Sequence, residues 1–269
     1  MALRHANVSV TPKQGAEHAV EFQTPEGPVA VNIATMSALR AAVDTRFTEG
    51  EGFALATLNL DHLVKLGQDH DFAAAYLAQD FVVADGNPVV WLSRLAHRPV
   101  DLMPGANLVV PLAQMAAAAN VSIALIGSTD DALDKAGAAL VARVPGLEIA
   151  AKIAPPMGFD PDSAAANTVL RDAAASGARL AFLALGAPKQ EALAARGRVV
   201  TPQMGFASIG ASLDFLSGHQ NRAPEWVQRI AMEWLWRLLS NPARLAGRYA
   251  RCFAILPRLT VNALALRKK

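Results

Sequence analysis

The sequence predicts an α/β fold in which a largely parallel sheet carries helices on both faces, followed by a basic helical appendage. Most strand-like runs are apolar throughout rather than alternating, which is typical of strands covered on both faces. These runs alternate with segments of helical periodicity, the rhythm of right-handed β–α–β crossovers. Strand-like runs cease after Gly218. The pattern is that of a Rossmann-like sheet with a separate helical tail.

The α/β domain is expected over residues 29–218, after an irregular, polar segment over 1–28 that ends in a short strand, Val29–Ile33. The other expected strands are Phe53–Leu58, Phe81–Ala84, Val121–Ile126, Leu147–Ile153, Leu180–Leu185 and Phe206–Ile209. Helical patterns lie over 35–49, 61–78, 88–96, 106–119, 130–143, 161–176 and 188–197.

The appendage, residues 219–269, is expected to be helical. Asn241-Pro242 ends one helix, and Pro257 interrupts the pattern near the end. The expected helices cover 224–239, 243–254 and 259–266. Three tryptophans are interleaved with arginines here (Trp226, Trp234, Trp236). Their spacing suits either a membrane interface or a packed helix, and we expect at least one of them to be packed.

Composition excludes several classes of protein. The chain has 269 residues, of which 52% are hydrophobic and 18% charged, enough for a sizeable core. A single cysteine, Cys252, rules out an internal disulfide framework and fits a reducing cytosol. No signal peptide is apparent, and no uncharged apolar stretch is long enough to predict a transmembrane helix.

The charge is distributed unevenly along the chain. Residues 219–269 hold ten Lys/Arg and two Glu, a net charge of +8, whereas residues 1–218 carry −6. A basic tail on an acidic body predicts an anionic partner such as a membrane surface, although a solvated helical face would have the same composition. Nucleic acid is not expected, because the body is acidic and lacks a basic groove.

Polar and glycine-rich turns follow the expected strands, at the edge where open α/β sheets hold ligands. Gly127-Ser128-Thr129 precedes a helix that Ser128 or Thr129 can cap, and its free N–H groups suit a phosphate. The chain has neither G-x-G-x-x-G nor G-x-x-x-x-G-K-[ST], so dinucleotide and P-loop binding are not indicated.

The turn Gly186-Ala187-Pro188-Lys189-Gln190 is more specific. Glycine lets the backbone approach a ligand, and proline suits the first helical position. Lys189 places a cation at the positive end of a helix, which an anionic ligand would explain better than folding does. An ordinary exposed lysine remains the alternative. Gln190 offers donors and acceptors to a sugar or base.

Asp85 stands where a buried strand meets the turn Gly86-Asn87-Pro88. Asp-Gly is a common turn pair, so a purely local role is the alternative. We expect Asn87 to cap the helix that begins at Pro88, which would free Asp85 to act as a general base.

Metal-binding patterns are poor. The six histidines include no H-x-x-x-H pair, and Cys252 is isolated. No metal site and no cofactor are therefore expected.

An ordered set of short motifs extends from about Val29 to Tyr249. They are Thr57-Leu58-Asn59-Leu60-Asp61-His62, Ala84-Asp85-Gly86-Asn87-Pro88, Pro104-Gly105-Ala106, Pro155-Pro156-Met157-Gly158-Phe159, Gly186-Ala187-Pro188-Lys189-Gln190-Glu191, Gly210-Ala211-Ser212-Leu213-Asp214-Phe215, Arg222-Ala223-Pro224, Glu233-Trp234, and Pro242-Ala243-Arg244 with Arg248-Tyr249. The set resembles the WecG/TagA/CpsF family of bacterial glycosyltransferases. The first 28 residues match nothing in that pattern, and Gly247 stands where a bulkier residue is usual.

The resemblance implies metal-free, inverting transfer from a UDP-sugar to a polyprenyl-diphosphate-linked glycan at the cytoplasmic face of the membrane, in cell-surface polysaccharide synthesis. It puts the catalytic base on Asp85. The donor-binding positions that the resemblance implies are Thr57, Asn59, Gly158, Phe159, Gln190 and Asp214, and the chemistry of the turns adds Gly127, Gly186 and Lys189. Acceptor or diphosphate contacts would come from Arg222, Arg229, Arg237, Arg244 and Arg248. Phe159 is expected to stack beside the uracil.

A non-catalytic protein that binds nucleotide sugars, with a regulatory role, is the competing interpretation, because it would share the same turns. The sequence leaves open which sugar is transferred, which glycan accepts it, whether the chain forms homo-oligomers and what residues 1–28 do.

Overall fold

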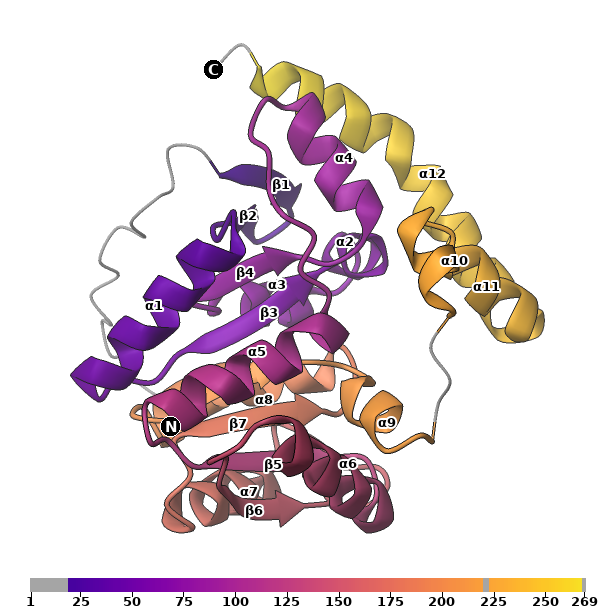
Figure 1. The fold of residues 1–269 in the computed structure, drawn as a ribbon. Coiled ribbons are helices and arrows are strands. Elements are labelled where there is room, and N and C mark those ends of the chain that lie inside the picture. Colours follow the sequence, from indigo (N-terminus) through magenta and orange to yellow (C-terminus); the bar gives the residue numbers. More distant parts are fainter. Residues whose placement is uncertain (1–18, 220–222, 268–269) are drawn as a thin grey trace.

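A six-stranded parallel sheet forms the centre of the protein (Figure 1). The computed structural model describes residues 19–219 and 223–267. The strand order is β4-β3-β8-β7-β5-β6, and every neighbouring pair is parallel. The strands are β3 (Ala54–Leu58), β4 (Phe81–Ala84), β5 (Ile123–Gly127), β6 (Ile149–Ile153), β7 (Leu180–Ala184) and β8 (Gly205–Ser208). The predicted α/β class and the strand positions are confirmed.

Helices cover both faces of the sheet, as expected. One face packs against α1 (Met36–Glu49), α5 (Gly105–Ala118) and α6 (Asp130–Arg143), and the other packs against α7 (Ala164–Ala175) and α8 (Lys189–Val200). Around β4 a third apolar cluster joins α2 (Leu60–Leu66), α3 (His70–Leu77) and α4 (Asn87–Leu95). One helix was expected over 61–78, but Asp69 caps a second helix by accepting from the Phe72 N–H at 3.0 Å, so the chain breaks there.

The segment before residue 29 is not irregular throughout. Strands β1 (Val20–Thr24) and β2 (Gly27–Val31) form an antiparallel hairpin, so that expectation is wrong for residues 20–24. Val20 and Phe22 alternate with polar neighbours and are buried against α12 (Pro242–Leu266), which gives the strand an apolar face. Residues 1–18 lie outside the described part of the chain.

The outer edge of β4, the first strand of the sheet, is covered by the chain that follows β2. The Asn32 side chain donates to the Asp80 carbonyl and accepts from the Val82 N–H, both at 2.7 Å. The Ile33 N–H then donates to the Val82 carbonyl at 3.3 Å. The Asn32 side-chain amide and the Ile33 N–H thus bind backbone groups that an edge strand otherwise leaves unpaired.

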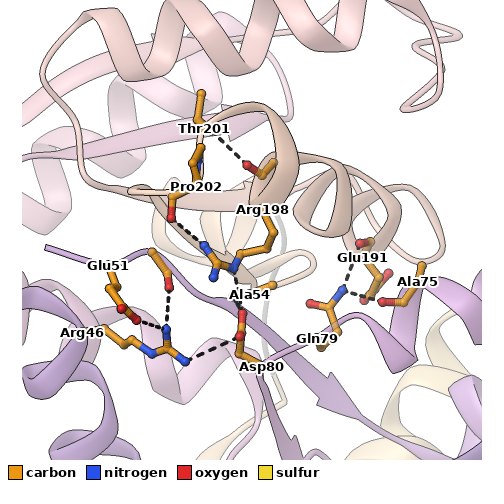
Figure 2. A network of polar contacts seen from close by, with 12 residues as sticks. Arg46, Glu51, Ala54, Ala75, Gln79, Asp80, Glu191, Arg198, Thr201 and Pro202 are labelled. Carbon is orange, nitrogen blue, oxygen red and sulfur yellow. Dashed lines mark hydrogen bonds and ion pairs between the residues drawn. The ribbon is translucent and has the colours of Figure 1, made fainter. Parts of the chain in front are cut away.

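The amino ends of the strands are tied together by a polar network around Asp80 (Figure 2). Its carboxylate accepts from the Ala54 N–H at 2.8 Å and from Arg198 Nε at 2.9 Å, and Arg46 lies 3.6 Å away. Arg198 also donates to the Pro202 carbonyl at 2.6 Å. The network joins α1, α8 and the starts of β3 and β4, at the edge opposite the turns predicted to bind ligand.

The appendage contains α10 (Glu225–Arg229), α11 (Glu233–Ser240) and the long helix α12. One helix was expected over 224–239, but Ala231 has φ of +60°, which divides it. The stop expected at Pro257 is also wrong: α12 continues through it, because the proline is exposed while Leu259 and Ala263 beyond it are buried beside α2–α4.

One appendage tryptophan is packed, as predicted. The ring of Trp234 meets Tyr249 and Phe253 of α12 edge-on, with ring centroids 5.9 and 5.4 Å apart. Trp226 and Trp236 are exposed. Cys252 is buried on α12.

Candidate active site

The turns that follow the parallel strands meet at one edge of the sheet. Parallel pairing places the carboxyl ends of neighbouring strands side by side. We call this region the carboxyl-edge site, and its turns begin at Asn59, Asp85, Gly127, Gly186 and Gly210.

Asp85 is held at the end of β4 and its side chain is half-buried. Its N–H donates to the Leu58 carbonyl at 2.8 Å, and its Oδ2 accepts from Asn59 Nδ2 at 3.3 Å. Helix α4 begins at Asn87, with Gly86 at φ +98° as the N-cap residue and no side-chain cap. The expectation that Asn87 caps this helix is therefore wrong, because Asn87 is already helical. Asp85 does not cap the helix either, as had been expected.

Asn59 holds the Asp85 carboxylate in place. Its Oδ1 accepts from the His62 N–H at 3.0 Å and so caps α2. Because the oxygen of the amide faces this helix start, the NH₂ group must face Asp85. The residue that was predicted to bind the donor thus also orients the predicted base.

Thr57 is buried at the end of β3, and two aromatic side chains fix the backbone there. The Tyr76 hydroxyl donates to the Thr57 carbonyl at 2.9 Å and lies 2.6 Å from His62 Nδ1. Since the Tyr76 proton is used, His62 Nδ1 is the donor in that second contact. Burial, followed by the charge of Lys65, lowers the pKa of His62 to about 3, so the ring is neutral at pH 7.

The Gly186 turn is fastened to its neighbours by the two polar side chains that follow it. Lys189 Nζ donates to the Phe159 carbonyl at 2.7 Å. Gln190 is 2% exposed; its Nε2 donates to Glu191 Oε1 at 2.8 Å, and its Oε1 accepts from the Gly210 N–H at 3.0 Å. Both side chains, predicted to contact the donor, bind other parts of the protein in this structure.

Phe159 and Gly158 lie in the loop that Lys189 holds. The Phe159 ring is buried in the apolar cluster under α7 and α8, so it is not presented for stacking here. Gly158 has φ of +83°, and a Cβ at this position would meet nothing within 4 Å. The glycine is required by the backbone conformation of the loop rather than by close packing.

The Gly127 turn is connected to α9 (Ser212–Leu216). Ser128 Oγ donates to Asp214 Oδ1 at 2.6 Å, and Thr129 caps α6 by accepting from the Ala132 N–H at 3.3 Å, as expected for one of the two hydroxyls. A Cβ on Gly127 would lie 2.5 Å from the Ala184 carbonyl oxygen, so close strand packing explains this glycine.

Several helices begin at this edge without a side-chain cap. Neither α4, α5 nor α8 has a side-chain cap, whereas Asn59 and Thr129 cap α2 and α6. Gly105 brings the start of α5 against Ile209, since a Cβ there would lie 2.8 Å from the Ile209 oxygen. Uncapped helix starts offer free N–H donors and positive potential to an anion.

Glu191 is a buried acid behind the site that sequence reasoning did not single out. It is 0% exposed, and its Oε2 has no hydrogen-bond partner among the described residues. Burial raises the pKa of Glu191 to about 7, although the Gln190 amide opposes this. Its place in the sequence could have indicated burial, because Glu191 follows Gln190 and shares a helical turn with the apolar residues Leu193 and Ala194, which are buried.

The predicted diphosphate-binding arginines are only partly brought to the site. Arg248 lies 2.7 Å from Asp61 Oδ2 on α2, and the Arg237 guanidinium lies 5.7 Å from the Phe215 ring centroid on α9. Both α2 and α9 follow turns of the carboxyl-edge site. Arg244 lies in the first turn of α12, whereas Arg222 and the side chain of Arg229 fall outside the described part of the structure.

Among residues 19–219 and 223–267, no group of three or more His, Cys, Asp or Glu side chains is arranged to hold a metal ion. The chain contains two D-x-D triplets, Asp69-His70-Asp71 and Asp160-Pro161-Asp162. In each, the first aspartate accepts a hydrogen bond from a nearby backbone N–H. Asp69 caps α3, and Asp160 accepts from the Asp162 N–H at 3.0 Å. In the same described ranges, no helix is long and apolar enough to cross a membrane.

Comparison with known proteins gives a consistent result. Residues 27–269 match the Glycosyl transferase WecG/TagA/CpsF family, a range that contains every turn of the site and the appendage. An N-acetylglucosaminyldiphosphoundecaprenol N-acetyl-beta-D-mannosaminyltransferase of Bacillus spizizenii is 29% identical over 201 residues, 74% of this chain and 76% of that protein. A protein of the same name from Bacillus subtilis is 28% identical over 195 residues, 72% of this chain and 73% of its own length.

Proposed function

Because the chain belongs to the WecG/TagA/CpsF family of glycosyltransferases, we propose that it transfers a sugar from a UDP-sugar to a polyprenyl-diphosphate-linked glycan. The observation that carries the proposal is the Asp85 carboxylate, held by Asn59 at the carboxyl edge of a parallel sheet. The two Bacillus relatives are named for an N-acetylglucosaminyldiphosphoundecaprenol acceptor and an N-acetylmannosaminyl group. UDP-N-acetylmannosamine and that acceptor class are therefore the first substrates to test.

In the proposed reaction Asp85 is the general base of a direct displacement. It takes the proton of an acceptor hydroxyl while the hydroxyl oxygen forms a bond to the anomeric carbon. The bond from that carbon to the UDP oxygen breaks on the opposite face, so the configuration inverts and UDP leaves with the electron pair. Asn59 keeps the carboxylate in one orientation during proton transfer, because its own amide is fixed by the start of α2.

Charge that develops on the UDP leaving group needs stabilisation. The starts of α4, α5 and α8, which have no side-chain cap, would supply it through their remaining N–H groups and the positive ends of the helices. Arg237 brings further positive charge from the appendage to α9. The proposed mechanism draws on these groups and uses neither a metal nor a cofactor.

The acceptor's lipid places the reaction at a membrane surface, which we propose to be the cytoplasmic face. The appendage offers Trp226, Trp236 and Leu239 as exposed apolar side chains, beside the arginines of a segment with a net charge of +8. Aromatic side chains settle at membrane interfaces, and each Lys/Arg near anionic lipid contributes about 1 kcal/mol. The protein would then bind the membrane peripherally.

The test is Asp85→Asn in an assay of UDP release with a lipid-linked acceptor. Turnover should fall by about 10²-fold or more, because the amide cannot accept the proton. UDP affinity measured by calorimetry should change little. The control is Asp134→Asn, an exposed carboxylate paired with Lys152 on the outside of α6.

Near-normal turnover in Asp85→Asn would remove this aspartate as the base. Absence of UDP release from the unmodified protein with every UDP-sugar in a panel, despite tight UDP binding, would favour the regulatory alternative instead.

A further inference from the structure

Where α12 crosses α2, three charged side chains form what we call the α2–α12 ion cluster: Asp61, Lys65 and Arg248. Asp61 Oδ2 lies 3.1 Å from Lys65 Nζ and 2.7 Å from the Arg248 guanidinium. The Asp61 side chain is only 13% exposed, whereas Lys65 and Arg248 are 35% and 39% exposed, so the carboxylate is shielded and the two cations reach solvent.

The cluster reaches the carboxyl-edge site from two directions. Asp61 is two residues after Asn59, the side chain that donates to Asp85. Lys65 Nζ also donates to the Ala187 carbonyl at 3.3 Å, in the turn after β7. Arg248 belongs to α12, so one carboxylate connects the appendage to the start of α2 and, through Lys65, to the Gly186 turn.

The charges in this cluster do not cancel. Burial, the largest influence, raises the pKa of Asp61, but the charges of Arg248 and Lys65 outweigh it and bring the pKa below its usual value. One carboxylate thus serves two cations, and the cluster keeps a net positive charge beside the site at pH 7. A surplus of positive charge there favours an anionic group of the substrate.

Holding α12 in place does not explain the cluster by itself. The distal half of that helix is already anchored by buried Leu259 and Ala263 and by Arg267, whose Nε donates to the Leu95 carbonyl at 2.6 Å. A shielded ion pair is a poor source of net stability, because desolvation offsets most of the attraction. What such a pair does supply is a fixed geometry for its members.

We infer that Asp61 is a positioning residue, which fixes Arg248 and Lys65 beside the carboxyl-edge site to receive the diphosphate of the lipid-linked acceptor. The inference rests on the proposed function and assigns a role to a residue that touches no substrate itself. It makes Asp61 a determinant of acceptor binding and not of donor binding. Loss of the carboxylate would remove the ion pair that orients Arg248 and would leave Lys65 with its contact to the Ala187 carbonyl.

The experiment is a double-mutant cycle on the full-length protein with Asp61→Asn, Arg248→Gln and the combination. Initial rates are measured with UDP-N-acetylmannosamine and a short-chain N-acetylglucosaminyl-diphospholipid in detergent. Each single variant should raise the acceptor KM by about tenfold or more with little change in kcat, the signature of lost ground-state binding. The acceptor KM of the double variant should lie within about twofold of that of the more impaired single variant, because both changes remove the same interaction.

Two further variants separate positioning from mere folding. Asp61→Glu keeps the charge and should recover a large part of the acceptor KM, whereas Arg251→Gln, on the exposed side of the same helix, should leave it within about twofold. UDP affinity by calorimetry should be unchanged in all of them. If Asp61→Asn does not fold, Arg248→Gln and Arg248→Lys test the same interaction from its other partner. Arg248→Gln should raise the acceptor KM, and Arg248→Lys, which keeps the charge, should restore it in part.

The inference is overturned if Asp61→Asn leaves the acceptor KM unchanged, if the two single effects multiply in the double variant, or if UDP affinity falls in parallel. These outcomes require that the unmodified protein transfers the sugar. If it does not, the proposed function has failed, and the two failures are distinguishable.

Discussion

The buried acid Glu191 makes the stability of this protein depend on pH in a predictable direction. Its pKa is raised from 4.5 to about 7 by burial, so the folded state retains a proton that the unfolded chain releases near pH 4.5. Stability from this group is therefore fully present below about pH 4.5 and is lost as the pH rises through about 7. Glu191→Gln removes the titration while it preserves size and polarity.

The size of the effect follows from the shift. A rise of the pKa from 4.5 to about 7 corresponds to roughly 3 kcal/mol of stability, most of which is lost between pH 5 and pH 8. The unfolding free energy of Glu191→Gln should thus rise relative to the unmodified protein by about that amount over this range. A constant offset is also expected, because the new NH₂ group replaces Oε2 where no hydrogen-bond partner is described.

Urea unfolding followed by tryptophan fluorescence at pH 5, 6, 7 and 8 measures the difference. Subtracting the two proteins at each pH cancels the titration of every group they share. Glu49→Gln, an exposed position on α1, controls for the loss of one negative charge. Curves for the unmodified protein and Glu191→Gln that stay parallel within about 0.5 kcal/mol would refute the account of Glu191 as a desolvated acid.

Four other substitutions test individual side chains. Gly127→Ala should lower the melting temperature by many degrees or prevent folding, because its Cβ would lie 2.5 Å from the Ala184 carbonyl oxygen; a small shift in a thermal melt would contradict the strand packing. Asn59→Ser can still cap α2 but lacks the amide NH₂ that donates to Asp85, so turnover should fall about tenfold or more while urea stability changes by less than about 1 kcal/mol; equal loss of both would make the contact structural. Trp236→Ala should weaken flotation with anionic liposomes without loss of stability. Trp234→Ala should lower the free energy of unfolding by about 2 kcal/mol or more and leave flotation unchanged. The opposite pattern would contradict the roles given to the two rings.

The parallel sheet and the place of the site could be predicted because both depend on local patterns. Strands such as β3 and β7 are buried on both faces and therefore read as uninterrupted apolar runs. Once the strands are parallel, the residues after them must share an edge, so Asn59 and Asp85 could be expected to lie together. Their hydrogen bond shows that they do lie together.

The remaining features depend on contacts between distant side chains, which periodicity does not encode. Gln190 reads as an exposed polar residue at a helix start, yet it is buried because Glu191 and the Gly210 N–H satisfy its amide. The pairing of Asp61 with Arg248 joins residues far apart in the chain. Pro257 has the composition of a helix stop, but tertiary packing beyond it overrides that preference.

The position of β4 at the margin of the sheet has a consequence for solubility. The strand that delivers Asp85 would, if bare, be a template on which a second molecule could add a strand. Asn32 prevents this with one carboxamide, whose two ends occupy the Asp80 carbonyl and the Val82 N–H. Backbone groups of the edge strand that carries the proposed base are thus covered by a side chain about fifty positions earlier in the chain. A change at Asn32 would first be noticed as precipitation, before any loss of catalysis.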